Sequence, residues 1–188
     1  MYMAFSASTR SADLSRQVGA VLAKNKNIIS TGANDVPSPQ GGLYWPIKDN
    51  NGYGIVDIEG GRDYTKGFDS NKNEIKLIID DIAKKLNLSQ EQIEKLKQTK
   101  INDITEYGRI VHAEMEAILS CARSNNSTLE STLYCTTFPC HNCAKHIIAS
   151  GVSRVVYIEP YSKSKALYFH EDSITEAKEN QNEESLKK

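Results

Sequence analysis

The feature that most constrains this chain is a pair of short segments rich in metal-binding side chains. One is His112-Ala113-Glu114, and the other is Pro139-Cys140-His141-Asn142-Cys143. Cysteine thiolates and a histidine nitrogen are good zinc ligands, and three protein ligands leave a fourth position for water. Two cysteines three residues apart at a helix start face the same way, and the helix N-terminus favours their negative charge. The pattern therefore predicts a zinc site on His112, Cys140 and Cys143.

The residue two positions after the histidine gives this site its expected chemistry. Zinc lowers the pKa of a bound water from about 16 toward about 7. A carboxylate beside that water can act first as a general base and then as a general acid. Glu114 is the predicted catalytic residue, and we expect it to face the metal's water without ligating the metal.

Other interpretations of these segments stay open. The two cysteines could be a redox pair, although no thioredoxin-like pattern surrounds them. The metal site could be closed and structural, with His146 as a fourth ligand, although His146 lies nearly a full helical turn beyond Cys143. We expect His141 to be a surface side chain. The other two cysteines, Cys121 and Cys135, are predicted to be buried small hydrophobic residues.

The remaining sequence predicts an α/β domain. Strands at 17–23 and 28–32, joined by a polar turn, indicate a β-hairpin. Beyond residue 110 helices and strands alternate, and Gly151 suits the left-handed position just past a helix end. This order favours a layered domain with a mixed sheet. The segments concerned are a helix at 111–123, a strand at 132–136, a helix at 140–150, a strand at 154–158 and a short helix at 164–170.

The segments around this alternating part are less regular. Residues 3–15 offer Ala4, Ala7, Ala12 and Leu14 to one helical face. Residues 32–71 hold eight of the eleven glycines, which favours an ordered loop. Residues 73–100 are predicted to form an inserted helical hairpin that serves packing, with a substrate lid or a subunit contact as the alternative. We expect one domain over 1–175 and a polar tail over 176–188.

A capping box is predicted inside the inserted hairpin. Ser89 followed three residues later by Gln92 has the required pattern, and Leu88 with Ile93 fits the hydrophobic staple around it.

Composition narrows the partners. Lys and Arg total 23 and Asp and Glu total 24, so the chain has no excess of basic residues. This balance mildly disfavours a long nucleic-acid substrate. The sequence contains no run of 18 apolar residues, so we expect no membrane span. The N-terminus lacks the pattern of a secretory signal. We therefore expect a reducing, cytoplasmic location in which the cysteines are not disulfide-bonded.

The H-x-E and P-C-x-x-C segments together resemble those of the zinc-dependent nucleobase deaminases. His112 to Met115 and Pro139 to Cys143 are similar to the cytidine and deoxycytidylate deaminase superfamily. The resemblance implies a three-layer cytidine-deaminase-like fold, with a central mixed sheet flanked by helices. It also implies Zn²⁺ as cofactor and hydrolytic deamination as the reaction.

Further stretches resemble one branch of that superfamily. The residues from Arg10 to Ala20 and the strand ending at Asn34 are similar to the opening of deoxycytidylate deaminases. The resemblance implies that Asn34 binds the sugar 3′-hydroxyl, and a turn asparagine after a strand is the alternative. The stretch from Gly41 to Trp45 and the one beginning at Glu159 resemble the deaminase domain of bacterial antiphage dCTP deaminases.

That second resemblance implies a deoxycytidine nucleotide (dCTP or dCMP) as substrate, with depletion of such nucleotides in antiphage defence. It also implies a homo-oligomer and a P-loop NTPase domain in a longer parent protein. The chain itself has no P-loop motif. The alternatives are deamination of cytosine or adenine in RNA or single-stranded DNA, and a non-catalytic zinc-stabilised nucleotide-sensing module.

Substrate contacts are expected from cationic and aromatic side chains. The predicted substrate-binding residues are Asn34, Arg16, Tyr161 and Lys163. Further candidates are Lys48, Arg62 and Lys165 for phosphate, and Tyr44 and Trp45 for the base. Glu116 departs from the asparagine usual in deoxycytidylate deaminases, and its carboxylate could repel a phosphate or face a neighbouring helix.

Overall fold

The computed structural model describes residues 1–177 and contains a four-stranded sheet in the order β2-β1-β5-β6. β1 pairs antiparallel with β2 and with β5, whereas β5 and β6 are parallel, so the mixed sheet expected from the sequence is confirmed. The elements are α1 (Tyr2–Ser8), β1 (Gly19–Lys24), β2 (Asn27–Ala33), β3 (Ile47–Lys48), β4 (Ile55–Val56), α2 (Asp63–Lys66), α3 (Ser70–Leu86), α4 (Gln90–Lys97), the 3₁₀ helix η1 (Lys100–Asp103), α5 (Ala113–Arg123), β5 (Thr132–Thr137), α6 (His141–Ala149), β6 (Arg154–Glu159) and α7 (Ala166–Phe169).

The chain divides into two units. The first contains residues 1–11 and 16–34 together with the chain from 111 on, and the second contains residues 12–15 and 35–110. The sheet of four strands, α1, α5, α6 and α7 all belong to the first unit.

The predicted hairpin of β1 and β2 closes through a two-residue turn. Lys24 pairs with Asn27, and the two residues between them, Asn25 and Lys26, have φ of 51° and 66°. Left-handed backbone at both turn positions matches the twist of the flanking strands. The local sequence thus sets the register of the first two strands.

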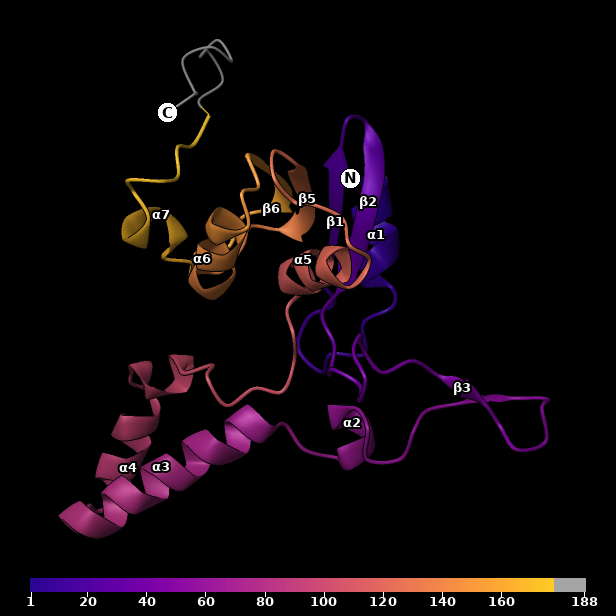
Figure 1. Ribbon diagram of the computed structural model, residues 1–188. Coiled ribbons are helices and arrows are strands. Elements are labelled where there is room, and N and C mark those ends of the chain that lie inside the picture. Colours follow the sequence, from indigo (N-terminus) through magenta and orange to yellow (C-terminus); the bar gives the residue numbers. More distant parts are fainter. Residues whose placement is uncertain (178–188) are drawn as a thin grey trace. The chain divides into compact units, whose positions relative to one another are not determined.

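Helices cover both faces of the sheet (Figure 1). A Cβ on Gly19 would lie 1.9 Å from the carbonyl oxygen of Ala4 in α1, and one on Gly32 would lie 2.1 Å from that of Ala113 in α5. Gly32 pairs with Ala20, the neighbour of Gly19, and neighbouring strand residues point to opposite faces. The two glycines therefore allow α1 and α5 to lie directly on the sheet from opposite sides, which gives three layers.

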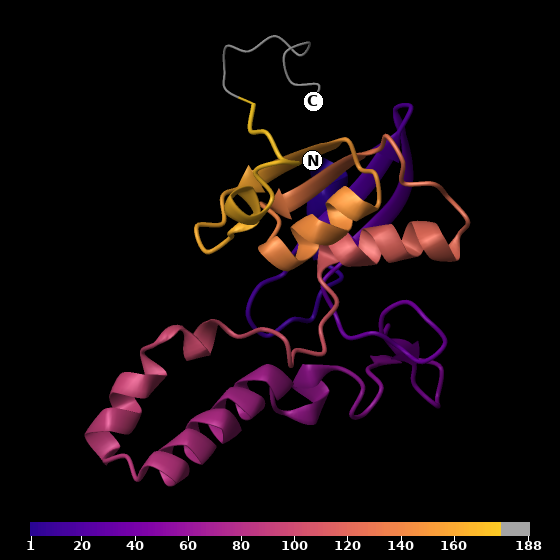
Figure 2. The same ribbon diagram turned by 60° about the vertical axis from the view of Figure 1, so that its left-hand side comes forward.

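The core lies between the sheet and α5 with α6. Leu22, Leu133, Ala117, Cys121 and Cys135 are all fully buried there. Figure 2 shows α5 and α6 side by side on this face. The prediction that Cys121 and Cys135 are buried small hydrophobic residues is confirmed, and burial raises the pKa of the Cys135 thiol.

The second unit contains the predicted helical hairpin. α3 begins after Asp69, whose carboxylate accepts bonds from two backbone N–H groups of the first turn. α4 follows the predicted capping box, because Ser89 and Gln92 exchange side-chain and backbone bonds. The prediction of a loop over 32–71 needs correction, since that stretch also contains the short strands β3 and β4 and the helix α2.

A buried arginine ties several segments of the second unit together. Arg62 is 5% exposed, and its Nε lies 3.6 Å from Asp35 and 3.5 Å from Asp57. Its guanidinium also donates to the carbonyl oxygen of Tyr44 at 2.8 Å. Arg62 is therefore paired with internal carboxylates, and this pairing disfavours the predicted contact with a substrate phosphate.

The N-terminal helix is shorter than the 3–15 pattern allows. Arg10 and Ser11 donate backbone bonds to carbonyls three residues earlier, which tightens the last turn of α1. Ala12 then donates to the carboxylate of Asp35 at 3.2 Å, so it follows a different path from the helix. Among residues 1–177, no helix combines the length and apolar character that a membrane crossing requires. Most of the predicted tail, from residue 178 on, lies outside the described residues.

Candidate metal centre

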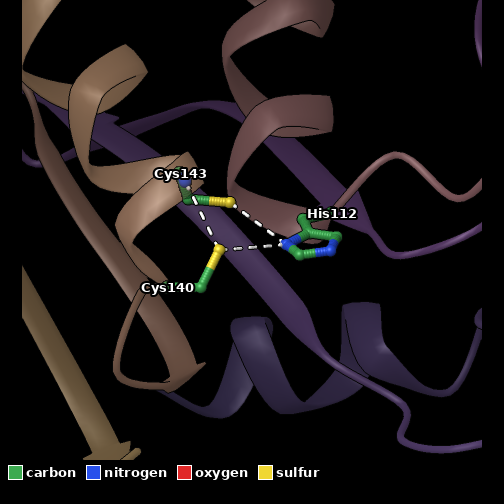
Figure 3. Close-up of side chains that lie close together, drawn as sticks. All are labelled: His112, Cys140 and Cys143. Carbon is green, nitrogen blue, oxygen red and sulfur yellow. Dashed lines mark hydrogen bonds between the residues drawn. The ribbon is translucent and has the colours of Figure 1, made fainter. Parts of the chain in front are cut away.

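Two helix starts bring the three predicted zinc ligands together. His112 is the residue before α5 and Cys140 is the residue before α6, while Cys143 lies in the first turn of α6. The side chain of His112 makes no capping bond to its helix, whereas Cys140 Sγ accepts a bond from the backbone N–H of Cys143 at 3.4 Å. Figure 3 shows the imidazole and both sulfurs pointing toward one another.

The spacing of the donor atoms fits zinc. His112 Nδ1 lies 3.4 Å from Cys140 Sγ and 3.3 Å from Cys143 Sγ. A tetrahedral zinc with sulfur at about 2.3 Å and nitrogen at about 2.0–2.1 Å separates those two ligand atoms by about 3.6 Å. The observed distances agree to within a few tenths of an ångström, and the soft sulfur and imidazole donors are those that zinc prefers.

The two thiols differ in their electrostatics. The hydrogen bond with Cys143, together with the neighbouring His112, lowers the pKa of Cys140 to about 3 despite its partial burial. The same bond and burial raise the pKa of Cys143. The Cys140 sulfur therefore favours the anionic form, and a cation at this position would be attracted to it.

Glu114 lies beside these donors and is buried. It is 4% exposed, and one of its oxygens, Oε2, is 3.6 Å from Cys143 Sγ. Burial raises the pKa of the Glu114 carboxyl, and a backbone hydrogen bond and the nearby His112 offset only part of that effect. Its carboxyl group is thus held next to the metal position without belonging to the set of three donors.

The remaining histidines of this region are not in the donor set. His146 is exposed, and the group of possible metal donors found among residues 1–177 does not contain it. His141 is partly buried rather than a surface side chain, which corrects the expectation. Its ring meets Phe169 of α7 edge to face at 5.8 Å, and its Nδ1 is buried without a hydrogen-bond partner.

Glu116 does not crowd the metal centre with a free carboxylate. It is 3% exposed and bonds to Arg123 further along α5, an arginine whose side chain is 39% exposed. Of the two expectations for this residue, repulsion of a substrate phosphate has no support in this pairing, because the charge of Glu116 is balanced within its own helix.

Asn34 and Arg16 meet near the beginning of β1. The Asn34 carboxamide accepts a bond from Val18 N at 2.6 Å and donates to the carbonyl oxygen of Arg16 at 2.7 Å. Asn34 is buried, and these two bonds fix the orientation of its carboxamide. The guanidinium of Arg16 is paired with the carboxylate of Glu159.

Tyr161 and Lys163 lie on the loop between β6 and α7. Tyr161 is partly buried and lines a cavity of about 230 Å³ with Phe138 and Tyr157, whereas Lys163 is exposed. Ser164 on the same loop donates its hydroxyl to the carbonyl oxygen of Pro139 at 2.7 Å. This bond fastens the loop to the residue before Cys140.

Four other candidate residues contact a neighbouring ring or lie in the second unit. The Lys165 amine stands 5.8 Å from the centre of the Phe169 ring. Tyr44, Trp45 and Lys48 belong to the second unit, where Trp45 is 55% exposed.

Sequence reasoning assigned no role to Glu159 or Ser164. The contact between Arg16 and Glu159 has no local sequence signature, because the two residues are far apart in the chain. The contact of Ser164 has none either, because it is made to a backbone carbonyl. The parallel pairing of β5 with β6, which joins these segments, was needed to find them.

A mixed sheet flanked by helices, with two sulfurs and one imidazole gathered at helix N-termini beside a buried carboxyl, defines a zinc-binding enzyme of the α/β class. Comparison with known proteins agrees. Residues 1–159 match the family model described as the cytidine and deoxycytidylate deaminase zinc-binding region.

Individual relatives point the same way. The deoxycytidylate deaminases of Enterobacteria phages T2 and T4 are 33% and 32% identical to this chain, each over 88% of it and over 80% and 78% of their own lengths. A crystal structure of the dCMP deaminase of cyanophage S-TIM5, in complex with dCMP and dUMP, shares the fold with a TM-score of 0.52. It is 21% identical, and the match covers 91% of this chain and 86% of that one.

The chain therefore belongs to the cytidine and deoxycytidylate deaminase family. Zinc is the cofactor of this family's site, and His112, Cys140 and Cys143 are positioned as its possible ligands.

Proposed function

We propose that this protein hydrolyses the amino group of a free deoxycytidine nucleotide, dCMP or dCTP, and releases the deoxyuridine nucleotide and ammonia. The observation that carries the proposal is the position of the buried Glu114 carboxyl, 3.6 Å from one of the three zinc donors. The similarity to deoxycytidylate deaminases of phages T2 and T4 supports the choice of substrate.

In this proposal His112, Cys140 and Cys143 hold the zinc, which when bound activates a water molecule and polarises it toward attack. Glu114 moves the protons. It accepts one from the attacking water and delivers it to ring nitrogen N3, and it then carries the second proton to the departing amino group. The balance is one water consumed, the C4–N bond broken, a C4–O bond formed and one ammonia released.

The burial of Glu114 favours catalysis over a purely structural metal site. A buried carboxyl that is not a ligand costs free energy to desolvate, and a structural site has no use for it. A closed site would need a fourth protein donor, and the donor group of the described residues contains only three. The same limited donor set leaves room for water and substrate.

For substrate contacts we propose Arg16 at the phosphate and Asn34 at the sugar hydroxyl, with Tyr161 and Lys163 closing the site from the loop after β6. Asn34 is ordered by its bonds to Val18 and Arg16, so its carboxamide is fixed in orientation. The loop carrying Tyr161 and Lys163 is fastened to the zinc-binding segment through Ser164. We assign the deaminase domain to residues 1–175, including the helical insert.

Three finer proposals rest on the resemblance to antiphage dCTP deaminases. They are nucleotide depletion during infection, assembly into a homo-oligomer and a P-loop NTPase domain in a longer parent protein. Expression of the chain in phage-challenged cells, with the Glu114→Ala variant as control, tests the first of these, because protection that survives the variant would contradict depletion by deamination.

The enzymatic proposal is tested by incubating the zinc-loaded protein with dCTP, dCMP, deoxycytidine, cytidine and a panel of RNA and single-stranded DNA. Turnover of dCMP or dCTP supports it. Deamination confined to the oligonucleotides would contradict it and would favour a polynucleotide deaminase.

A further inference from the structure

The ion pair between Arg16 and Glu159 takes no part in the proton transfers proposed above, and Glu159 has no role so far. Arg16 lies shortly before β1, and Glu159 is the last residue of β6. Their side chains are 48% and 57% exposed, so the pair stands at the surface. An exposed pair of this kind contributes little to the stability of a fold. The position of the pair near the zinc-binding segment suggests a role in substrate binding.

The backbone of both residues is fixed close to the zinc-binding segment. Glu159 pairs with Thr137 in the parallel register, and its carbonyl oxygen accepts a bond from Phe138 N at 2.8 Å. Cys140 follows Phe138 by two residues, a stretch that spans at most about 7 Å. On the other side, Asn34 holds the carbonyl oxygen of Arg16. The ion pair is therefore within a nucleotide's reach of the metal position.

The chemistry of the pair allows a change of partner. A guanidinium binds a phosphate through two parallel charge-assisted bonds, as it does a carboxylate. An exposed carboxylate is a weak competitor for Arg16 and can be displaced. After displacement, the negative charge of Glu159 remains beside the phosphates, and its repulsion grows with the number of phosphate groups.

We propose that Glu159 is a specificity-determining residue, which competes with the nucleotide phosphates for Arg16 and so sets how strongly the enzyme responds to phosphate number. The inference rests on the proposed function and on the phosphate-binding role of Arg16 within it. Glu159 holds the guanidinium in place when no nucleotide is bound and weakens the binding of each added phosphate.

The test compares Glu159→Gln, Arg16→Gln and the double variant on deoxycytidine, dCMP and dCTP. Glu159→Gln should lower KM for dCMP by about threefold. It should lower KM for dCTP by a larger factor and leave deoxycytidine unchanged. Arg16→Gln should raise KM for both nucleotides by about tenfold or more. In the double variant the effect of Glu159→Gln on the nucleotides should shrink, because competition for Arg16 is then absent and only the direct repulsion of the phosphates by Glu159 is relieved.

Glu171→Gln is the matched control, since it removes the same charge from another exposed glutamate of the first unit. An equal KM change on all three substrates, or the same change in the control, would overturn the proposal. Binding of dCMP and dCTP to the same variants in a Glu114→Gln background gives a readout that does not need turnover. If the proposed function is wrong, none of the substrates will be deaminated. If only this inference is wrong, the nucleotides will be deaminated, but Glu159→Gln will not change their KM selectively.

Discussion

Cys143 Sγ lies 3.6 Å from Glu114 Oε2, so a predicted zinc ligand and a buried carboxyl from different helices lie next to each other. α5 contributes the carboxyl and α6 the thiol, and each residue lies in the first turn of its helix. Helix starts are well suited to this purpose, because their unbonded N–H groups favour anionic sulfur and oxygen. The packing of α5 beside α6 thus places a buried carboxyl, the proposed proton carrier, next to the metal position.

Replacing Glu114 by Gln tests this arrangement. The amide has nearly the same shape but cannot accept and return a proton, so we expect kcat to fall by about 10²–10⁴-fold. Zinc content should stay at one ion per chain, because Glu114 is not among the three donors. Elemental analysis and steady-state kinetics on one preparation check both results. Loss of the zinc with the activity would instead make Glu114 part of the metal-binding set.

Glu116→Gln is a second test on the same helix, two residues further on. The variant weakens the bond with the partly exposed Arg123 and should lower the free energy of unfolding by about 1 kcal/mol. We expect kcat and KM to stay unchanged, because the carboxylate is already paired with Arg123. Thermal unfolding and kinetics with dCMP and dCTP provide the measurements. A selective drop in KM for dCTP would show that Glu116 does repel phosphates.

Gly32→Ala tests how closely α5 lies on β2. The new Cβ would stand 2.1 Å from Ala113 O and 2.5 Å from Ala117 N, which are backbone atoms that cannot turn aside. α5 must shift, so we expect a loss of about 1–3 kcal/mol in stability. Because His112 and Glu114 stand at the start of α5, activity should also fall at temperatures where the variant is folded.

The matched control for that variant is Gly19→Ala, whose Cβ would meet α1 on the opposite face. It should cost a similar amount of stability and leave the kinetics of the folded protein nearly unchanged. Equal activity loss in both variants would mean that the sheet as a whole, rather than the position of α5, controls the site.

Arg62→Met tests the buried charge cluster of the second unit. Removing the guanidinium leaves Asp35 uncompensated at 3% exposure, with Asp57 beside it, and breaking such a buried pair costs about 3–5 kcal/mol. Hydrogen exchange should therefore speed up across residues 35–110. Lys76→Met, at an exposed position on α3, is the control and should change stability by less than about 0.5 kcal/mol. Unchanged exchange in Arg62→Met would show that the cluster contributes little.

The zinc donors could be predicted from the sequence because their signal is local. Cys140 and Cys143 belong to one helix start, and the distance of His112 from them is set by two helices that the sequence pattern also predicts. The sheet was predictable for the same reason, since each strand carries its own apolar pattern and the hairpin turn at Asn25 and Lys26 fixes the first register.

Contacts between distant segments could not be predicted in this way. The pairing of Arg16 with Glu159 depends on the register of β6 against β5, and burial of Arg62 depends on two aspartates from separate loops. The path of the chain after α1 has a similar origin, because Ala12 N donates to the carboxylate of Asp35, a residue far along the sequence. The partial burial of His141 depends on α7 covering it through Phe169.

The most direct test of the account is product analysis on the zinc-loaded protein with dCMP and dCTP, before and after removal of the metal by a chelator. We predict equal amounts of deoxyuridine nucleotide and ammonia from at least one of the two, loss of that activity with the zinc, and its return when zinc is added back. Zinc bound by His112, Cys140 and Cys143 together with no deamination of either nucleotide would contradict the account.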